Sequence, residues 1–179
     1  STNQIVEFVY VGTTLYGLSD IGGSTEKLYM NTNFATPSWG GTFGAILAAF
    51  DGKLFIEYQG TLYMSRSGQF ISTYVIATVT YSAGQAITFT NITQGLIHSK
   101  DDVLYFGYDN NIASKNGAGA WNLTALVLPT NMIITSLAEY GNLLAIGCRP
   151  QYAGGRSRVY IWDRNSSFAT LQESTDFGE

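Results

Sequence analysis

Short apolar runs separated by small or polar residues recur along the whole chain. The most complete set lies between Met132 and Glu179, where a Gly-rich loop separates apolar runs at 143–148 and 158–162. The turn residues 140–142 precede the first run, and the polar residues 163–167 follow the second. This pattern predicts a meander of four strands joined by hairpin turns.

Three weaker copies of this pattern lie upstream. The predicted second strands are spaced by 39, 50 and 39 residues and begin at Leu15, Leu54, Leu104 and Leu143. A small or polar turn precedes each of them, and Asp51-Gly52 is the strongest hairpin signal, because both residues of a type I′ turn need a positive φ. Periods of about 40 to 50 residues are those of four-stranded propeller blades.

The predicted third strands also align with one another. Each is followed by a polar turn and then by an aromatic ring; these strands are 28–30, 62–64, 112–113 and 159–162. No segment has the spacing of apolar residues that a capped helix requires. We therefore predict an all-β fold, a β-propeller-like array of about four four-stranded antiparallel blades, which could be an incomplete ring. The blades are expected at about 5–40, 44–93, 94–129 and 132–177, within a single domain 1–179.

Two segments leave alternatives open. Residues 44–50 are apolar on both faces and predict the first strand of the second blade; a short helix is the alternative, against which the hairpin signal at Asp51-Gly52 argues. Residues 81–93 are surplus to four strands and predict either a fifth strand in the second blade or a projecting hairpin.

Sheets that are apolar on both faces must be covered on both sides. Stacking of blades provides this cover and leaves only short edges. The stack could be completed by further sequence or by other copies of the chain, or it could stay open. A β-sandwich is the nearest rival, but it does not explain the repeated register of turns and rings.

Composition narrows the possible partners. Only 12% of the residues are charged, against about 25% in an average soluble domain, which indicates that other blades or subunits cover much of the surface. The net charge of −4 gives no reason to expect nucleic acid, and no apolar stretch predicts membrane insertion. The single cysteine, Cys148, lies in an apolar run and is predicted to be a buried small hydrophobe rather than a reactive thiol.

Candidate catalytic groups are few. The only histidine, His98, lies on a predicted inner strand and favours a core or channel-lining role over a metal ligand or a triad with Asp101 or Asp102. Most carboxylates that could form a glycosidase pair lie in predicted turns, where acids cap local backbone N–H groups; they are Asp20, Glu26, Asp51, Glu57, Asp101, Asp102, Asp109, Glu139 and Asp163. Asp109-Asn110-Asn111 could hold calcium but is above all a hairpin turn. We therefore predict no catalytic residues, no metal site and no cofactor.

Arginines gather in the last blade, together with exposed tyrosines. Because Arg149, Arg156, Arg158 and Arg164 come from one blade rather than from several, they favour a solvated or interfacial patch over a sialidase-type carboxylate clamp. The candidate interaction surface consists of Arg149, Tyr152, Arg156, Arg158 and Tyr81.

Three resemblances to known families can be stated. Residues 159–163 resemble the end of the third strand of a WD-repeat blade, although the Gly-His of that family is absent, and residues 114–121 are similar to a degenerate sialidase-type Asp-box with Asn116 in place of Asp. The last blade, through 144–147, 154–163 and 176–178, most resembles propeller-like structural proteins of tailed phages.

The low charge, the lack of a catalytic set, the segment 81–93 and the polar loop at 149–157 predict a non-enzymatic structural or attachment module of a virion, such as a phage tail, or of an extracellular assembly. It would act through protein–protein contacts with other subunits or further blades. The alternatives are a glycan-binding or glycan-cleaving, sialidase-like propeller and an intracellular WD-type scaffold.

Overall fold

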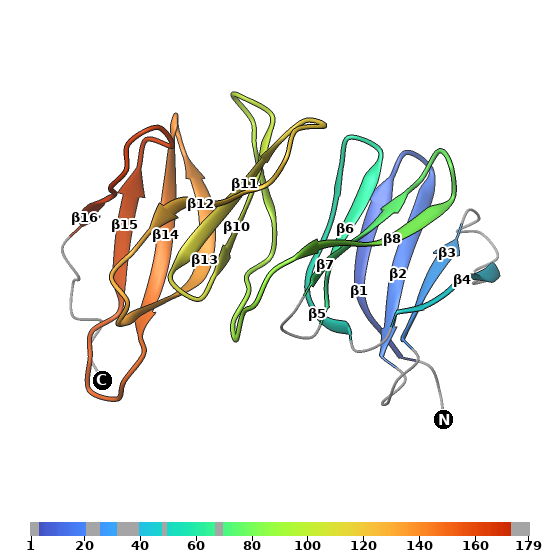
Figure 1. The fold of residues 1–179 in the computed structure, drawn as a ribbon, viewed down its shortest axis with the longest axis horizontal. Coiled ribbons are helices and arrows are strands. Elements are labelled where there is room, and N and C mark those ends of the chain that lie inside the picture. The colour runs from blue at the N-terminus through green and yellow to red at the C-terminus, as the bar shows by residue number, and fades with distance from the viewer. Residues whose placement is uncertain (1–3, 21–25, 32–39, 48–49, 67–69, 173–179) are drawn as a thin grey trace. The chain divides into compact units, whose positions relative to one another are not determined.

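The computed structural model describes residues 4–20, 26–31, 40–47, 50–66 and 70–172. These residues form sixteen strands in four four-stranded antiparallel sheets, and none of them is helical. In each sheet the strands lie in chain order, so that every sheet is a meander (Figure 1). The predicted all-β fold of four-stranded antiparallel blades is confirmed.

The chain divides into two compact units, Ser1–Thr88 and Phe89–Glu179. The first unit contains sheets A and B. Sheet A consists of β1 (Gln4–Val11), β2 (Thr14–Asp20), β3 (Glu26–Asn31) and β4 (Gly40–Leu47). Sheet B consists of β5 (Phe50–Tyr58), β6 (Thr61–Arg66), β7 (Phe70–Val75) and β8 (Thr80–Ala86).

The second unit contains sheets C and D, whose strands lie where the sequence predicts them. Sheet C consists of β9 (Leu96–His98), β10 (Val103–Tyr108), β11 (Asn111–Asn116) and β12 (Asn122–Val127). Sheet D consists of β13 (Met132–Tyr140), β14 (Leu143–Pro150), β15 (Arg158–Trp162) and β16 (Thr170–Gln172).

Two strand assignments in the first unit differ from the prediction. Residues 44–47 belong to β4, the last strand of sheet A, rather than to the first strand of the second blade. The surplus segment at 81–93 begins inside β8, which is the fourth strand of sheet B, because a turn at 76–79 ends β7 early. Val79 has a φ of 54°, and the Ile76 N–H donates to the Gly60 carbonyl at 2.9 Å, which fixes this turn. Sheet B is therefore a four-stranded sheet, not a five-stranded one.

In the first unit, one face of sheet A packs against one face of sheet B. Tyr16, Leu18 and Leu28 from sheet A share a buried cluster with Leu62 and Met64 from sheet B. The rings of Tyr16 and Tyr74 lie 6.4 Å apart at a tilt of 54°. The contact is aromatic and aliphatic, with few polar groups to satisfy.

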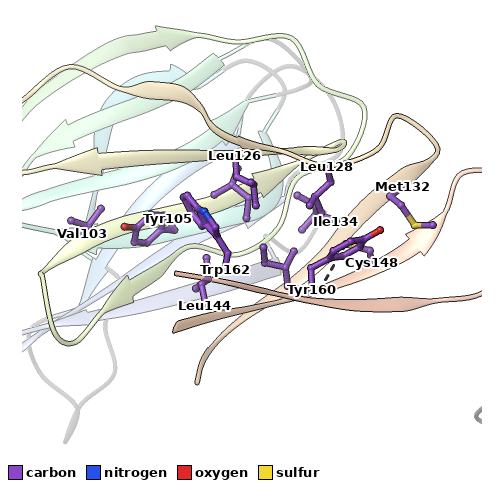
Figure 2. Close-up of a cluster of buried hydrophobic side chains, with 12 residues drawn as sticks. Val103, Tyr105, Leu126, Leu128, Met132, Ile134, Leu144, Cys148, Tyr160 and Trp162 are labelled. Carbon is purple, nitrogen blue, oxygen red and sulfur yellow. Dashed lines mark hydrogen bonds between the residues drawn. The ribbon is translucent and has the colours of Figure 1, made fainter. Parts of the chain in front are cut away.

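In the second unit, sheets C and D bury a larger cluster, drawn in Figure 2. Trp162 stands edge-on to Tyr105, with ring centroids 6.0 Å apart and planes at 86°. This T-shaped arrangement is favourable because the positive edge of one ring meets the negative face of the other. Leu144 and Ile146, both fully buried, complete the contact from β14.

Cys148 belongs to the same cluster and is 3% exposed. Desolvation of the thiolate by burial raises the pKa of its thiol to about 12. The prediction of a buried small hydrophobe is confirmed, and the raised pKa disfavours the reactive thiolate. None of the described residues forms a helix long and apolar enough to cross a membrane.

Candidate functional site: a histidine–carboxylate–arginine cluster

Four chemically active side chains meet at one end of sheets C and D, in the second unit. His98 is the last residue of β9, Asp101 lies in the turn that follows, Glu139 lies near the end of β13, and Arg164 lies in the turn after β15. We call these four residues the His98 cluster. They come together because sheets C and D stack, which brings the hairpin turns of consecutive blades side by side.

His98 is the buried centre of the cluster, with a fully buried side chain. Its Nδ1 lies 3.5 Å from Asp101 Oδ1 and 3.8 Å from Glu139 Oε1, and accepts a hydrogen bond from the Lys100 N–H at 3.3 Å. The other ring nitrogen is Nε2. That nitrogen is buried and has no hydrogen-bond partner among the described residues. An unsatisfied buried polar atom is costly, which makes His98 an unusual residue for a purely structural core.

Arg164 fixes the position of Asp101. Its Nε and Nη2 donate to the Asn142 carbonyl at 3.3 and 2.9 Å, and its Nη1 donates to Asp101 Oδ2. The Arg164 side chain is only 8% exposed, whereas that of Asp101 is 37% exposed. A mostly buried guanidinium thus holds a carboxylate whose other oxygen faces His98 and solvent.

Glu139 is fixed from the other side. Its Oε1 accepts a hydrogen bond from the Ser99 N–H, so that the end of β13 is tied to the turn after β9. This backbone hydrogen bond lowers the pKa of the Glu139 carboxyl, and the charges of His98 and Arg164 contribute in the same direction. Glu139 is therefore ionised at neutral pH.

The lowered pKa of Glu139 predicts a pH-dependent contribution to stability. Because the folded pKa is depressed, the contribution is present above the unfolded pKa of about 4.3 and is lost as the pH falls through the folded value. Glu139→Gln should therefore destabilise the protein at pH 7, and the difference from wild type should shrink as the pH falls below about 4. Urea unfolding of both proteins between pH 7 and pH 3 measures this difference. A difference that stays constant or grows toward acid pH contradicts the assignment.

Two carboxylates of the cluster lie close together. Asp101 Oδ1 and Glu139 Oε1 both face His98 Nδ1. The distance between these two oxygens therefore cannot exceed the sum of their distances to Nδ1. That bound lies below the upper limit of roughly 9.5 Å between the paired carboxylates of glycosidases. The two acids come from different sheets, and their side chains are 37% and 32% exposed.

Another turn acid, Asp163, is satisfied locally, as the sequence predicts. Asp163 Oδ1 accepts from the Ser166 N–H at 2.7 Å and from the Asn165 N–H at 2.9 Å, and hydrogen bonds with Ser166 lower the pKa of this carboxyl. Asp109 Oδ1 accepts from the Asn91 N–H at 2.9 Å, so the acid considered for calcium ties the segment before β9 to the hairpin of β10 and β11. No group of His, Cys, Asp and Glu side chains in the described part of the chain has the arrangement to hold a metal ion.

The segment that resembles an Asp-box is also a closed turn. The Gly119 N–H donates to the Asn116 carbonyl at 3.1 Å, and Lys115 Nζ donates to the Gly119 carbonyl at 2.5 Å. The same ammonium lies 5.6 Å from the ring centroid of Trp121. These contacts explain the turn without any role specific to the Asp-box family. The Asp-box resemblance stays a prediction.

The residues of the candidate interaction surface come from both units. Arg149, Tyr152 and Arg156 are exposed around the loop between β14 and β15, and Tyr152 is 71% exposed. Arg158 is half-buried, with its Nη1 3.4 Å from the hydroxyl of Tyr160. Tyr81 belongs to the first unit, packs against the core of that unit and donates its hydroxyl to Ser72 Oγ at 3.1 Å. An interaction role for these residues stays a prediction.

The sequence contained a signal for the His98 cluster that residue-by-residue reasoning missed. Ser99 and Glu139 are 40 residues apart, which is close to the repeat spacing, so His98 and Glu139 end the first strands of consecutive blades. Stacking of equivalent blades places such positions side by side.

No protein-family model matches this chain, and no curated protein matches its sequence. Solved structures do resemble its fold. The extracellular domain of BT4673 from B. thetaiotaomicron matches 97% of this chain and 23% of that chain at 15% identity, with a TM-score of 0.66. The computationally designed protein Ika8 matches 93% of this chain and 48% of that chain at 15% identity, with a TM-score of 0.59.

A sialidase has the same fold. Trypanosoma rangeli sialidase matches 95% of this chain and 37% of that chain at 10% identity, with a TM-score of 0.58. The chain spans less than half the length of each of these three proteins. Together with the four sheets, these likenesses show that the fold is of the β-propeller type.

The comparisons correct one prediction. The sequence predicts a protein that is not an enzyme, and this prediction is wrong, because the fold is also that of an enzyme: the sialidase has been captured with 2,3-difluorosialic acid as a covalent intermediate. The prediction rested on the absence of sequence motifs, and a motif search does not detect groups that come together from separate blades. The His98 cluster is drawn from two sheets.

Proposed function

We propose that this chain is a glycan-recognition module of the β-propeller type that acts outside the cell, with the His98 cluster as its sugar-contacting site. The observation that carries the proposal is the convergence of two partly exposed carboxylates, Asp101 and Glu139, on one buried histidine. Likeness to an extracellular domain and to a sialidase supports the location and the class of ligand.

The geometry suits the recognition of sugar hydroxyls. Carboxylate oxygens are acceptors, and each of these two acids has one oxygen held by a protein donor, Arg164 for Asp101 and the Ser99 N–H for Glu139. Acids fixed in this way lose little conformational freedom when a ligand binds, so their hydrogen bonds contribute more to affinity. Lys100, exposed on the same turn as Asp101, adds a cationic donor for an acidic sugar.

The same groups suit glycoside hydrolysis. Because its pKa is lowered, Glu139 is the member of the pair that stays ionised at neutral pH, the state required of a base or a nucleophile. A second carboxylate within range is the other requirement, and Asp101 meets it. Binding is thus the primary activity in this proposal, and hydrolysis is the reaction that the site would support.

A glycan array followed by hydrolysis assays on chromogenic glycosides tests the proposal. Wild type should bind a defined set of glycans, and Asp101→Asn combined with Glu139→Gln should weaken binding at least tenfold. Asp102→Asn is the matched control, because Asp102 lies on the same turn outside the cluster and its φ of 51° is one that asparagine tolerates. Absence of both binding and hydrolysis, or equal losses in the cluster variant and the control, would rule the proposal out.

A second candidate function is attachment through protein contacts in an extracellular assembly or a virion. It is favoured by the exposure of Arg149, Tyr152 and Arg156 around one loop, with Tyr152 71% exposed. Exposed tyrosine and arginine side chains are typical of binding hot spots. Cosedimentation with intact virions or cell envelopes, lost on Tyr152→Ala with Arg156→Ala, is the expected result; no cosedimentation of wild type with either would rule it out.

A further inference from the structure

Each sheet of this fold has two faces, and the burial of those faces differs along the chain. In sheets B and C both faces are buried: Leu54 and Met64 represent the two faces of sheet B, and Leu104 and Ile112 those of sheet C, all four fully buried. Sheets A and D each have one face in a buried cluster and one face with large exposed apolar side chains. These two exposed faces are the subject of the inference.

The exposed face of sheet A carries large rings. In β1, Phe8 is 52% exposed and Tyr10 is 59% exposed, whereas the alternate residues Val9 and Val11 pack against the cluster with sheet B. The strand register places Phe8 beside Gly17 and Gly17 beside Tyr29, so two rings flank a glycine in one row. We call this surface the Phe8 face; it consists of the exposed Phe8 and Tyr10, the half-buried Leu15 and Tyr29, and the buried Gly17 between the rings.

The exposed face of sheet D is flat and built from small residues with an apolar rim. Its central rows pair Ala138 with Ala145 and Ser136 with Gly147, and Val159, which is 43% exposed, continues the second row. Tyr140, at one end, is 65% exposed. We call this surface the Val159 face; it consists of Ser136, Ala138, Tyr140, Leu143, Ala145, Gly147, Val159 and Ile161.

Sheet C indicates what the Val159 face is built to contact. Gly107 pairs with Ile112 in sheet C as Gly147 pairs with Val159 in sheet D, so the two faces are equivalent. On sheet C this face packs against sheet D, and Ile112 is fully buried. The equivalent Val159 is 43% exposed. The Val159 face therefore has the side chains of a blade-to-blade contact.

The opposite half of such a contact is also exposed in this chain. A stacking contact joins two different faces: the face of one sheet that corresponds to the Val159 face, and the opposite face of the next sheet. In sheet A this opposite face is exposed, and it is the Phe8 face. The rings of Phe8, Tyr10 and Tyr29 complement the small residues Ala138, Ala145 and Gly147. Two Val159 faces together would oppose small residues to small residues, and two Phe8 faces would oppose rings to rings, so the complementarity favours contact between unlike faces.

We propose that this chain associates head to tail with a second copy of itself, the Phe8 face of one copy packing on the Val159 face of the other. The contact repeats between copies the packing of sheet on sheet that sheets C and D make within the chain. Arg149, which follows Gly147 on the same face of β14, lies at the edge of this interface. The proposal is independent of the sugar site, since no residue of the His98 cluster lies on either face.

Sedimentation velocity over a range of protein concentrations tests the proposal. Wild type should show concentration-dependent association, and both Tyr10→Glu and Val159→Glu should weaken it at least tenfold, because each buries a charge in the contact. Val127→Glu is the matched control, since Val127 is 52% exposed on the edge strand β12 and belongs to neither face. It should associate like wild type. Circular dichroism of each variant confirms the fold, which substitution of exposed residues should leave intact.

Mixing the two variants gives the decisive result. A Tyr10→Glu chain keeps an intact Val159 face, and a Val159→Glu chain keeps an intact Phe8 face, so an equimolar mixture should form a heterodimer that neither variant forms alone. Association lost in only one variant indicates contact between like faces and overturns the proposal. A wild type that stays monomeric at every concentration overturns it as well, and means that another partner covers these faces.

Discussion

Replacing Trp162 by alanine should lower the free energy of unfolding of the second unit by about 3–5 kcal/mol, one of the largest effects that a single truncation can have. Trp162 is 2% exposed and stands edge-on to Tyr105 across the contact between sheets C and D. Its Nε1 donates to the Ser166 carbonyl at 2.7 Å, which also holds the turn that carries Arg164. Alanine removes the ring, the hydrogen bond and the volume that the indole fills between the sheets, and natural domains have only about 5–15 kcal/mol to lose.

Urea unfolding followed by far-ultraviolet circular dichroism measures this effect without depending on the fluorescence of the residue removed. Phe168→Ala is the control, because Phe168 follows in the next turn but is 68% exposed, and its loss should change stability by no more than about 0.5 kcal/mol. Trp162→Phe should fall between the two, since it keeps a ring but loses the hydrogen bond to Ser166. Equal losses in Trp162→Ala and Phe168→Ala would contradict the role given to Trp162.

The parts of the fold that the sequence predicted well are those with a sharp turn between two apolar runs. Strand β10, at Val103–Tyr108, follows the polar turn at 100–102 and has the bounds that the pattern predicts. The hairpin of β13 and β14 is likewise marked by Gly141, whose φ of 59° suits a glycine. In such cases the turn residues and the apolar pattern predict the same strand, and the packing of the sheets does not alter its position.

The parts that were assigned wrongly lack such a signal. Residues 44–47 are apolar on both faces, and a run of this kind does not distinguish the last strand of one blade from the first strand of the next. The turn that separates β7 from β8 passes through Val79, a β-branched residue with a φ of 54°. Valine is among the least expected residues at a positive φ, so no pattern of turn residues could have predicted this turn.

The candidate site was predicted residue by residue but not as a group. His98, Asp101, Glu139 and Arg164 were all visible as candidates, and the local expectation for turn acids is correct for Asp163. It misses Asp101 and Glu139, because their partners come from another blade: Arg164 is 63 residues from Asp101. Only the stacking of sheets decides which turn acids close their own turn and which converge on a neighbour.

The stacking itself can be tested at Gly107, where β10 of sheet C packs closely against Ile134 of sheet D. A Cβ at this position would lie 2.5 Å from Ile134 Cγ2, 3.0 Å from Ile134 Cβ and 3.2 Å from Thr93 Cγ2. Ile134 is 2% exposed and its N–H donates to the Asp109 carbonyl at 2.7 Å, so neither its side chain nor its backbone can move away easily. Gly107→Ala should therefore destabilise the second unit by about 1–3 kcal/mol through overpacking.

The decisive measurement is the coupling between Gly107→Ala and Ile134→Ala. Ile134→Ala alone leaves a cavity and should cost about 2–5 kcal/mol, but the same cavity receives the methyl group that Gly107→Ala adds, so the double variant should be more stable than the sum of the single effects by about 0.5–3 kcal/mol. Gly141→Ala is the control, because nothing lies within 4 Å of its added Cβ and its cost arises from a φ of +59° alone. It should show no coupling to Ile134→Ala in urea unfolding. Additive effects at Gly107 and Ile134 would mean that these two residues are not in contact, and the packing of sheet C on sheet D would then be wrong.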